Sequence, residues 1–271
     1  MTTNILFVDV DDTLVTAKDG KQFIPPSALD ALAQVRAHGD RVYLCTGRSL
    51  AEALTIGDVP IDGIIGAAGG FVLDGDTMVM HQTFTAGQVE QAEGRLRSIG
   101  AAYYLESNSG LYFEERYLDY AREAWGIGND SSWDGVAKPL DQVDRTDINK
   151  MCFFLDTGMT YAEAVAPLEE HFTCVPSSYG DRRSVAGEIS LPGVSKATAI
   201  QTLLAHLDLP SVRTFGLGDS ANDIPMLQVC DEAIVMGDAR HGDVAAHATY
   251  VTLPVLEDGI AHALRHFGLI G

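Results

Sequence analysis

Three carboxylates stand within four positions near the start of the chain, directly after an apolar run. Asp9, Asp11 and Asp12 follow the segment "NILFV". Two like charges about 4 Å apart cost roughly 4 kcal/mol at an effective dielectric of about 20, so such a group either spreads into water or surrounds a cation. Residues two apart in an extended chain project to the same side, which directs Asp9 and Asp11 toward one ligand. This pair suits a nucleophile beside a general acid and base.

A second acidic cluster lies much later, in the stretch "GDSANDIPML". It contains Asp219, Asn222 and Asp223. Four carboxylates near one point require a cation, and ligands that are all oxygen favour a hard ion such as Mg²⁺. Asp219 could instead cap the helix that follows, and that role is compatible with metal binding.

Two further stretches carry groups that suit a phosphate. Thr46 and Gly47 follow the apolar run "VYLC", and a hydroxyl with backbone N–H groups at a helix entrance is what a phosphate oxygen needs. Lys196 stands at the predicted start of a helix, where the helix dipole disfavours a cation. We therefore expect Lys196 to neutralise carboxylates and hold phosphate, the alternative being a plain surface lysine. Arg182 and Arg183 could contact a phosphorylated or acidic substrate, or could be solvated loop residues.

The elements that must position these residues alternate between strand and helix. The runs 4–10 and 41–45 read as buried strands, and the segment 25–39 between them reads as a helix with Ser27 as its N-cap. This rhythm predicts parallel strands with right-handed crossovers, followed by a hairpin around the Asp-Gly turn of "LDGD". Ligands of such sheets bind beyond the carboxyl ends of the strands, where all four polar clusters fall.

The rhythm is interrupted in the middle of the chain and then resumes. Residues 84–191 hold both tryptophans and a stretch rich in Gly, Asn and Ser, and they read as an α+β insertion. We predict an α/β core formed by residues 1–83 and 192–271, with the insertion 84–191 as a second domain.

Composition excludes several partners. The chain has 271 residues with 18 Lys and Arg against 38 Asp and Glu, a formal net charge of −20, which repels nucleic acids and anionic membranes. No apolar stretch approaches 18 residues, and no basic segment followed by a long apolar one stands at the N-terminus. The four scattered cysteines indicate reduced thiols, so we expect a cytoplasmic location. No obligate protein partner is indicated.

The four clusters together carry a resemblance to a known family. "DVDDTL", "LCTGR", "GVSK" and "GDSANDIPML" resemble, in this order, the four motifs of the haloacid dehalogenase-like hydrolases. The match is similar to the Cof-type branch, which has an α/β (type IIB) cap inserted between the second and third motifs. The resemblance covers essentially the whole chain and implies a Rossmann-like parallel-sheet core with an inserted α+β cap.

The resemblance also implies roles for individual residues. Asp9 would take the phosphoryl group as an aspartyl-phosphate, and Asp11 would protonate the leaving oxygen and then deprotonate the attacking water. Mg²⁺ would be held by Asp9, the backbone carbonyl of Asp11 and Asp219, with Asp223 in support. Phosphate would be bound by residues of three motifs, namely Thr46, Gly47, Lys196 and Asn222.

Two positions depart from the family pattern. Asp12 stands where relatives often have glycine, and aspartate tolerates turn conformations, so we expect little consequence. Ala68 precedes Gly69 where this branch commonly has an Asn-Gly pair, so any contact of that amide with phosphate or substrate is missing.

The sequence therefore predicts a Mg²⁺-dependent phosphatase that acts on a small phosphorylated metabolite, such as a sugar phosphate. A phosphotransferase or phosphomutase would use the same aspartyl-phosphate with another acceptor. A phospho-receiver signalling module is an alternative from a different class. The insertion and Asp11 argue against it, because a receiver must keep its aspartyl-phosphate.

Overall fold

The structure is a computed structural model that describes residues 2–18, 21–125, 135–155, 158–177, 185–239 and 242–271. The chain forms two compact units. The core unit contains Met1–Gly47, Ile56–Met80 and Ser195–Gly271, and the cap unit contains Arg48–Thr55 and His81–Val194.

The core unit is built on an eight-stranded sheet in the order β16-β15-β14-β1-β4-β5-β6-β7. The six strands from β16 to β5 run parallel, and β6 pairs antiparallel with β5. The strands are β1 (Thr3–Val8), β4 (Arg41–Cys45), β5 (Gly63–Gly66), β6 (Phe71–Asp74), β7 (Thr77–His81), β14 (Val212–Gly218), β15 (Glu232–Val235) and β16 (Tyr250–Val251). A separate two-stranded sheet pairs β2 (Thr16–Lys18) with β3 (Lys21–Phe23).

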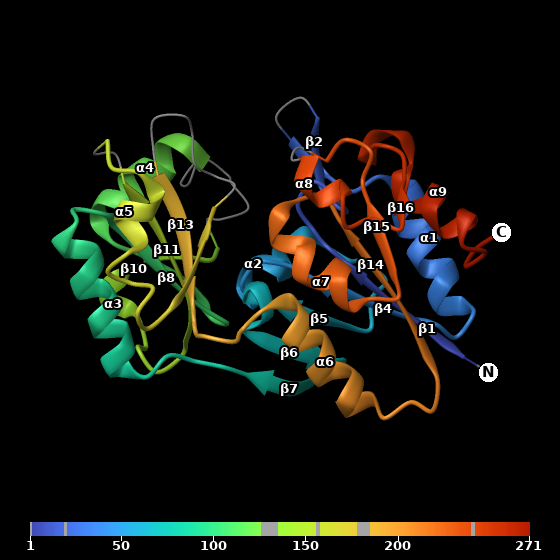
Figure 1. The fold of residues 1–271 in the computed structure, drawn as a ribbon, viewed down its shortest axis with the longest axis horizontal. Helices are drawn as coiled ribbons and strands as arrows, with labels where there is room; N and C mark the ends of the chain where they lie inside the picture. The colour runs from blue at the N-terminus through green and yellow to red at the C-terminus, as the bar shows by residue number, and fades with distance from the viewer. Residues whose placement is uncertain (1, 19–20, 126–134, 156–157, 178–184, 240–241) are drawn as a thin grey trace. The chain divides into compact units, whose positions relative to one another are not determined.

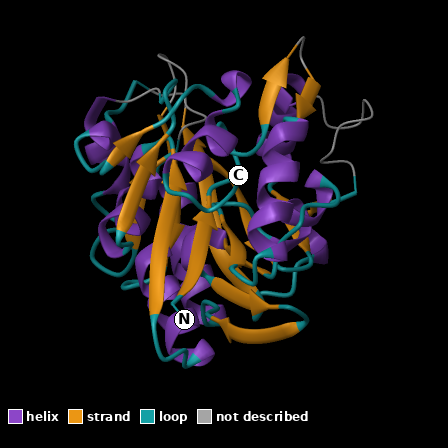
Figure 2. Ribbon diagram, turned by 90° about the vertical axis from the view of Figure 1, so that its right-hand side faces the viewer, coloured by secondary structure: helices purple, strands orange, loops and turns teal. Residues whose placement is uncertain are grey.

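Helices lie on both sides of this sheet (Figures 1 and 2). Ile5 and Phe7 of β1 pack in one cluster with Ile200 of α6 and Met226 of α7, while α1 and α9 contact each other on the other face. The core helices are α1 (Pro26–Ala37), α6 (Lys196–Leu207), α7 (Ile224–Val229), α8 (Gly242–Ala245) and α9 (Gly259–His266). Short 3-10 turns are η2 (Ala67–Gly69), η4 (Ala221–Asp223) and η5 (Val255–Glu257). The predicted α/β class is confirmed.

One local prediction was wrong. The N-cap of α1 is Pro25 rather than Ser27, because the helix begins at Pro26, whose fixed φ suits the first helical position. Ser27 lies inside the first turn, and its hydroxyl donates a hydrogen bond of 2.5 Å to Asp258 Oδ1.

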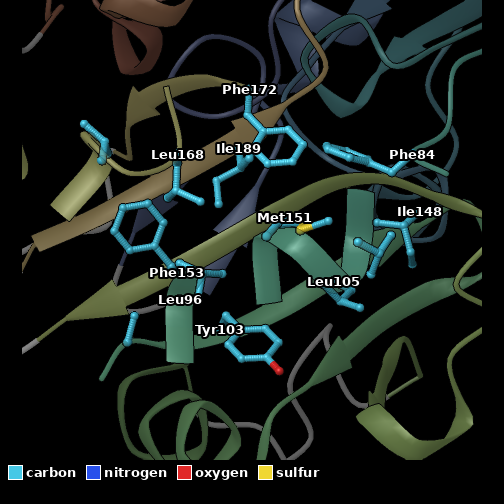
Figure 3. Packing of buried hydrophobic residues seen from close by; sticks show 14 of the residues in the cluster. Phe84, Leu96, Tyr103, Leu105, Ile148, Met151, Phe153, Leu168, Phe172 and Ile189 are labelled. Atoms are coloured by element: carbon cyan, nitrogen blue, oxygen red, sulfur yellow. The ribbon is translucent and has the colours of Figure 1, made fainter. Parts of the chain in front are cut away.

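The cap unit has its own six-stranded sheet in the order β10-β9-β8-β11-β13-β12. Phe84, Leu96, Tyr103 and Phe153 belong to an apolar cluster on one face (Figure 3). The strands are β8 (Ala102–Ser107), β9 (Gly110–Phe113), β10 (Ala137–Pro139), β11 (Ile148–Leu155), β12 (Thr173–Pro176) and β13 (Val185–Ser190). The helices are α2 (Leu50–Ala53), α3 (Ala86–Ser98), α4 (Glu115–Trp125) and α5 (Tyr161–Val165), with the 3-10 turns η1 (Leu54–Ile56) and η3 (Leu140–Gln142).

The segment Arg48–Thr55 packs with the cap unit although it follows core strand β4 in the sequence. Ala51 of α2 packs against the cluster that contains Tyr104 and Phe113. The predicted domain limits at 83/84 and 191/192 did not include this segment in the cap. The limits remain a prediction from sequence.

Candidate active site

Three neighbouring parallel strands deliver the first residues of the site to one edge of the core sheet. Val8, the last residue of β1, pairs with Leu217 of β14 on one side and with Leu44 of β4 on the other. Asp9 follows directly, and its N–H donates to the Leu217 carbonyl at 2.9 Å. Asp219 follows β14 in the same way. Asp9 and Asp219 reach this edge because each follows directly after a buried apolar strand.

Lys196 joins two acidic motifs from the start of α6. Its Nζ lies 2.6 Å from Asp9 Oδ1 and 2.6 Å from Asp223 Oδ1. Its side chain is 1% exposed, so both ion pairs are removed from water. The two carboxylates explain how a lysine is tolerated at the positive end of a helix. The lysine and the two acids were predicted from sequence as site residues, and the structure brings them together.

The electrostatics of this group follow from burial and from the neighbouring charges. Burial raises the pKa of Asp9 well above its ordinary value, the charge of Asp223 adds to the rise, and Lys196 opposes it. Burial alone would lower the pKa of Lys196, but Asp223 and Asp9 outweigh it and raise that pKa. Lys196 therefore stays protonated and supplies a fixed positive charge.

Three carboxylates could hold a cation. Oxygen atoms of Asp9, Asp219 and Asp223 all lie within 4.8 Å of one another, and all three residues are buried. Asp223 is already engaged, since Oδ1 accepts from Lys196 and Oδ2 accepts from the N–H groups of Asp219 and Ser220. An all-oxygen donor set of this kind fits a hard divalent ion such as Mg²⁺, with Asp223 in a supporting position.

Asp11 and Asp12 differ in their surroundings. Asp12 adopts a left-handed conformation with φ of 57°, and its N–H donates to the Val15 carbonyl at 2.8 Å. This agrees with the expectation that Asp12 is a turn residue. Asp11 lies next to it, partly exposed, and its side chain is outside the three-carboxylate group. Its predicted metal contact through the backbone carbonyl stays a prediction.

The remaining predicted residues are spread more widely. Thr46 is fully buried after β4, and its N–H donates to the Ile65 carbonyl at 2.9 Å, with Gly47 next to it partly exposed. Asn222 is exposed, and its Oδ1 accepts a hydrogen bond of 2.8 Å from the Ser220 hydroxyl. Their predicted contacts with phosphate stay predictions. Arg182 and Arg183 lie outside the described residues.

Sequence reasoning missed Gly218, which allows Asp223 to reach its position. A Cβ atom on Gly218 would lie 2.5 Å from Asp223 Cγ, far inside van der Waals contact. Any side chain at position 218 would therefore displace the carboxylate that holds Lys196. The signal was present in "GLGD", where a glycine ends an apolar strand immediately before an aspartate.

A second charged cluster, also missed, lies inside the cap unit. Glu106 of β8 stands opposite Lys150 of β11, and Lys150 Nζ lies 3.1 Å from Glu106 Oε1 and 3.4 Å from Glu188 Oε2. Glu52 of α2 is buried nearby, and burial, followed by the charge of Glu106, raises its pKa to about 8. We call Glu52, Glu106, Lys150 and Glu188 the Lys150 cluster. Its residues come from four elements, which is why spacing along the sequence could not reveal it.

The chain is similar to known proteins along nearly its whole length. The haloacid dehalogenase-like hydrolase family matches residues 6–264. Phosphatase YwpJ of Bacillus subtilis is 24% identical over 97% of this chain and 99% of that protein. The putative bifunctional phosphatase/peptidyl-prolyl cis-trans isomerase of Streptococcus pyogenes is 26% identical over 98% of this chain, but the chain spans only 54% of that protein.

A solved structure shares the fold. The HAD subclass IIB sugar phosphatase BT4131 superposes with a TM-score of 0.76 at 24% identity, covering 99% of this chain and 100% of that one. The chain belongs to the haloacid dehalogenase-like hydrolases. The predicted family is thus confirmed, and the names of the relatives agree with the predicted phosphatase class. Among the described residues, no helix combines the length and apolar character needed to cross a membrane.

Proposed function

We propose that this chain is a Mg²⁺-dependent phosphatase that hydrolyses small phosphorylated metabolites through an aspartyl-phosphate on Asp9. The observation that carries the proposal is the buried arrangement of Asp9 and Asp223 around Lys196, with Asp219 beside them. A free carboxylate oxygen of Asp9 is a suitable nucleophile when its other oxygen is held by a lysine. The net negative surface makes a small substrate a better fit than a nucleic acid.

The chemistry divides into two balanced steps. In the first, an Asp9 oxygen bonds to phosphorus while the bond from phosphorus to the leaving oxygen breaks, and Asp11 gives that oxygen a proton. In the second, Asp11 takes a proton from water, the water oxygen bonds to phosphorus and the bond to Asp9 breaks, which releases inorganic phosphate. Asp11 then carries the proton it began with, so the cycle closes.

Positive charge around the phosphoryl group would come from two sources. Lys196 is a permanent cation in contact with Asp9, and it would offset charge on the transferring oxygens without moving. Mg²⁺ bound by Asp9 and Asp219, with the Asp11 carbonyl as a third ligand, would supply further positive charge and hold the phosphoryl group in line. Thr46, Gly47 and Asn222 would hold phosphate oxygens from the neighbouring loops.

Sugar phosphates are the substrate class we propose first. A solved structure with the same fold is named as a sugar phosphatase, which supports that choice. Arg182 and Arg183, from the cap region, are our candidates for substrate contacts. We also propose a cytoplasmic location, because all four cysteines are free thiols.

The test is a screen of phosphorylated metabolites with and without Mg²⁺, in which phosphate release is measured. The blank is Asp9→Asn, and the matched control is Asp12→Asn, the same substitution at a neighbouring turn position. We expect release only with Mg²⁺, none from Asp9→Asn and near wild-type rates from Asp12→Asn. An active Asp9→Asn variant, or full activity in excess EDTA, would overturn the proposal. Adding a sugar acceptor distinguishes hydrolysis from phosphoryl transfer.

A further inference from the structure

The turn between β5 and β6 has an unusual backbone. Ala67, Ala68 and Gly69 have φ values of 49°, 53° and 107° in succession. This left-handed region is unfavourable for residues with a Cβ atom, and two consecutive alanines adopt it here. Such a conformation persists only where the surrounding structure holds it in place.

Two parts of the site hold this turn. The Ala68 N–H donates a hydrogen bond of 3.1 Å to the carbonyl of Thr46. On the other side, Gly69 lies directly against the start of α6. A Cβ atom built on Gly69 would be 2.2 Å from the Ser195 carbonyl oxygen and 3.1 Å from the Lys196 backbone nitrogen. The turn therefore connects the loop that contains Thr46 with the start of α6, where Lys196 lies. All three segments belong to the core unit.

We propose that Gly69 is a positioning residue for Lys196 in the phosphatase reaction. Its lack of a side chain lets the backbone of Ser195 and Lys196 approach the turn, and this approach places Lys196 Nζ against both Asp9 and Asp223. A methyl group at position 69 forces the Ser195 carbonyl to retreat by about 1 Å to reach ordinary contact, and a misplacement of that size costs catalysis up to ~100-fold. This inference rests on the proposed function of the site.

The N-cap of α6 is a second contact that could position Lys196. Ser195 Oγ accepts a hydrogen bond of 3.2 Å from the Thr198 N–H, which also anchors the first turn of the helix. The cap bond is local to the helix, whereas the Gly69 contact ties the helix to the rest of the site. Removing the Ser195 hydroxyl leaves the carbonyl against Gly69 in place, so the two causes can be separated.

The experiment compares Gly69→Ala with Gly39→Ala and Ser195→Ala, each measured for kcat, KM and melting temperature. Gly39 has φ of +88° and nothing within 4 Å of a built Cβ, so its variant also places a Cβ atom on a backbone of positive φ but without the collision. We expect Gly69→Ala to lose about 10- to 100-fold in kcat with KM changed less than about threefold. Both other variants should keep kcat within about twofold, although they lower the melting temperature.

The outcomes separate this inference from the proposed function. If wild type releases no phosphate above the Asp9→Asn blank, the proposed function fails. If wild type is active and folded Gly69→Ala keeps kcat within twofold, the role of Gly69 is refuted. If Gly69→Ala does not fold, the Ser195→Ala variant distinguishes the two causes. Retention of kcat supports the positioning of Lys196 by the turn, whereas a tenfold loss of kcat assigns the positioning of Lys196 to the cap bond.

Discussion

Lys196 and Asp9 are 187 residues apart in the sequence and form a buried ion pair of 2.6 Å at the edge of the core sheet. Asp223 contacts the same ammonium group at the same distance, so one lysine is shared by two carboxylates. Lysine at the first position of a helix is unfavourable by itself. Its placement makes sense as part of a charge arrangement in which the cation is the partner of the nucleophile.

Replacing Lys196 by methionine should reduce kcat by about 100- to 1,000-fold, because a fixed positive charge next to the transferring phosphoryl group is lost. Asp9 and Asp223 would also lose the ammonium group that they share, and a proton held between the two carboxylates in its place would weaken the nucleophile. Steady-state kinetics on the best substrate measure this effect. The matched control is Lys138→Met in the cap unit, and a Lys196→Met enzyme within tenfold of wild type would contradict our assignment.

Asp11→Asn should separate the two chemical steps. With p-nitrophenyl phosphate the leaving group needs little protonation, so Asp9 can still be phosphorylated, while attack by water loses its general base. We expect a burst of about one nitrophenolate per enzyme, followed by a steady-state rate at least ~100-fold below wild type. Rapid-mixing absorbance measures the burst, and Asp12→Asn is its control. Steady turnover at the wild-type rate would remove Asp11 from the mechanism.

The residues of the core site could be predicted because they follow buried strands. Asp9, Thr46 and Asp219 each come directly after an apolar run, and parallel strands bring their carboxyl ends to one edge. Lys196 was found through its unfavourable position in a helix. In each case the functional residue lies in a short motif that can be recognised from the sequence alone.

The rest depended on contacts between distant backbone segments. Nothing in the segment Arg48–Thr55 indicates that it packs with the cap unit, since its apolar residues would suit either unit. The sequence around Lys150 does not indicate an acidic partner, and only the register of β11 with β8 places Glu106 opposite it. Likewise, Gly69 could be recognised as special only once Ser195 was seen against it.

Lys150→Met should destabilise the cap unit. The Lys150 side chain is 5% exposed and is the cation between Glu106, which is buried, and Glu188, which is partly buried, so its loss leaves both acids without a counter-charge. Breaking a buried ion pair from one side costs about 3–5 kcal/mol. Urea unfolding followed by circular dichroism measures the loss. Lys138→Met, from the same unit, should lower the free energy of unfolding by only about 1 kcal/mol, because Lys138 is partly exposed and loses one hydrogen bond to the Ser109 carbonyl and a contact with the Tyr112 ring. Equal effects of the two variants would disprove a structural role for the Lys150 cluster.

Glu52 should make stability depend on pH. Its pKa is raised to about 8 in the folded protein, chiefly by burial, so the folded state keeps a proton that the unfolded chain releases above its ordinary value of 4.5. The contribution of Glu52 to the free energy of unfolding is at its maximum below about pH 4.5. It falls as the pH rises toward 8 and is constant above about pH 8. Glu52→Gln removes the titration. We expect the variant to gain at least about 1 kcal/mol relative to wild type between pH 5 and pH 8.

The control for Glu52 is Glu90→Gln, an exposed glutamate on α3 of the same unit. Its free energy of unfolding should follow the wild-type pH dependence in parallel. The measurement is denaturant unfolding at several pH values in one ionic strength, since screening also changes with salt. A Glu52→Gln curve parallel to wild type would show that the carboxyl of Glu52 is ionised in the folded state.

Ala68→Gly should stabilise the protein, against the usual direction of such a change. Ala68 has φ of 53°, where a Cβ atom costs roughly 1–2 kcal/mol that glycine avoids. The same substitution at Ala205, exposed within α6, should destabilise by about 1 kcal/mol because helical backbone disfavours glycine. Calorimetry should therefore find melting temperatures shifted in opposite directions, each by roughly 2–4 °C for a change of 1 kcal/mol. If both variants melt below wild type, the left-handed backbone at Ala68 is not strained, and the turn relies on its alanine for packing.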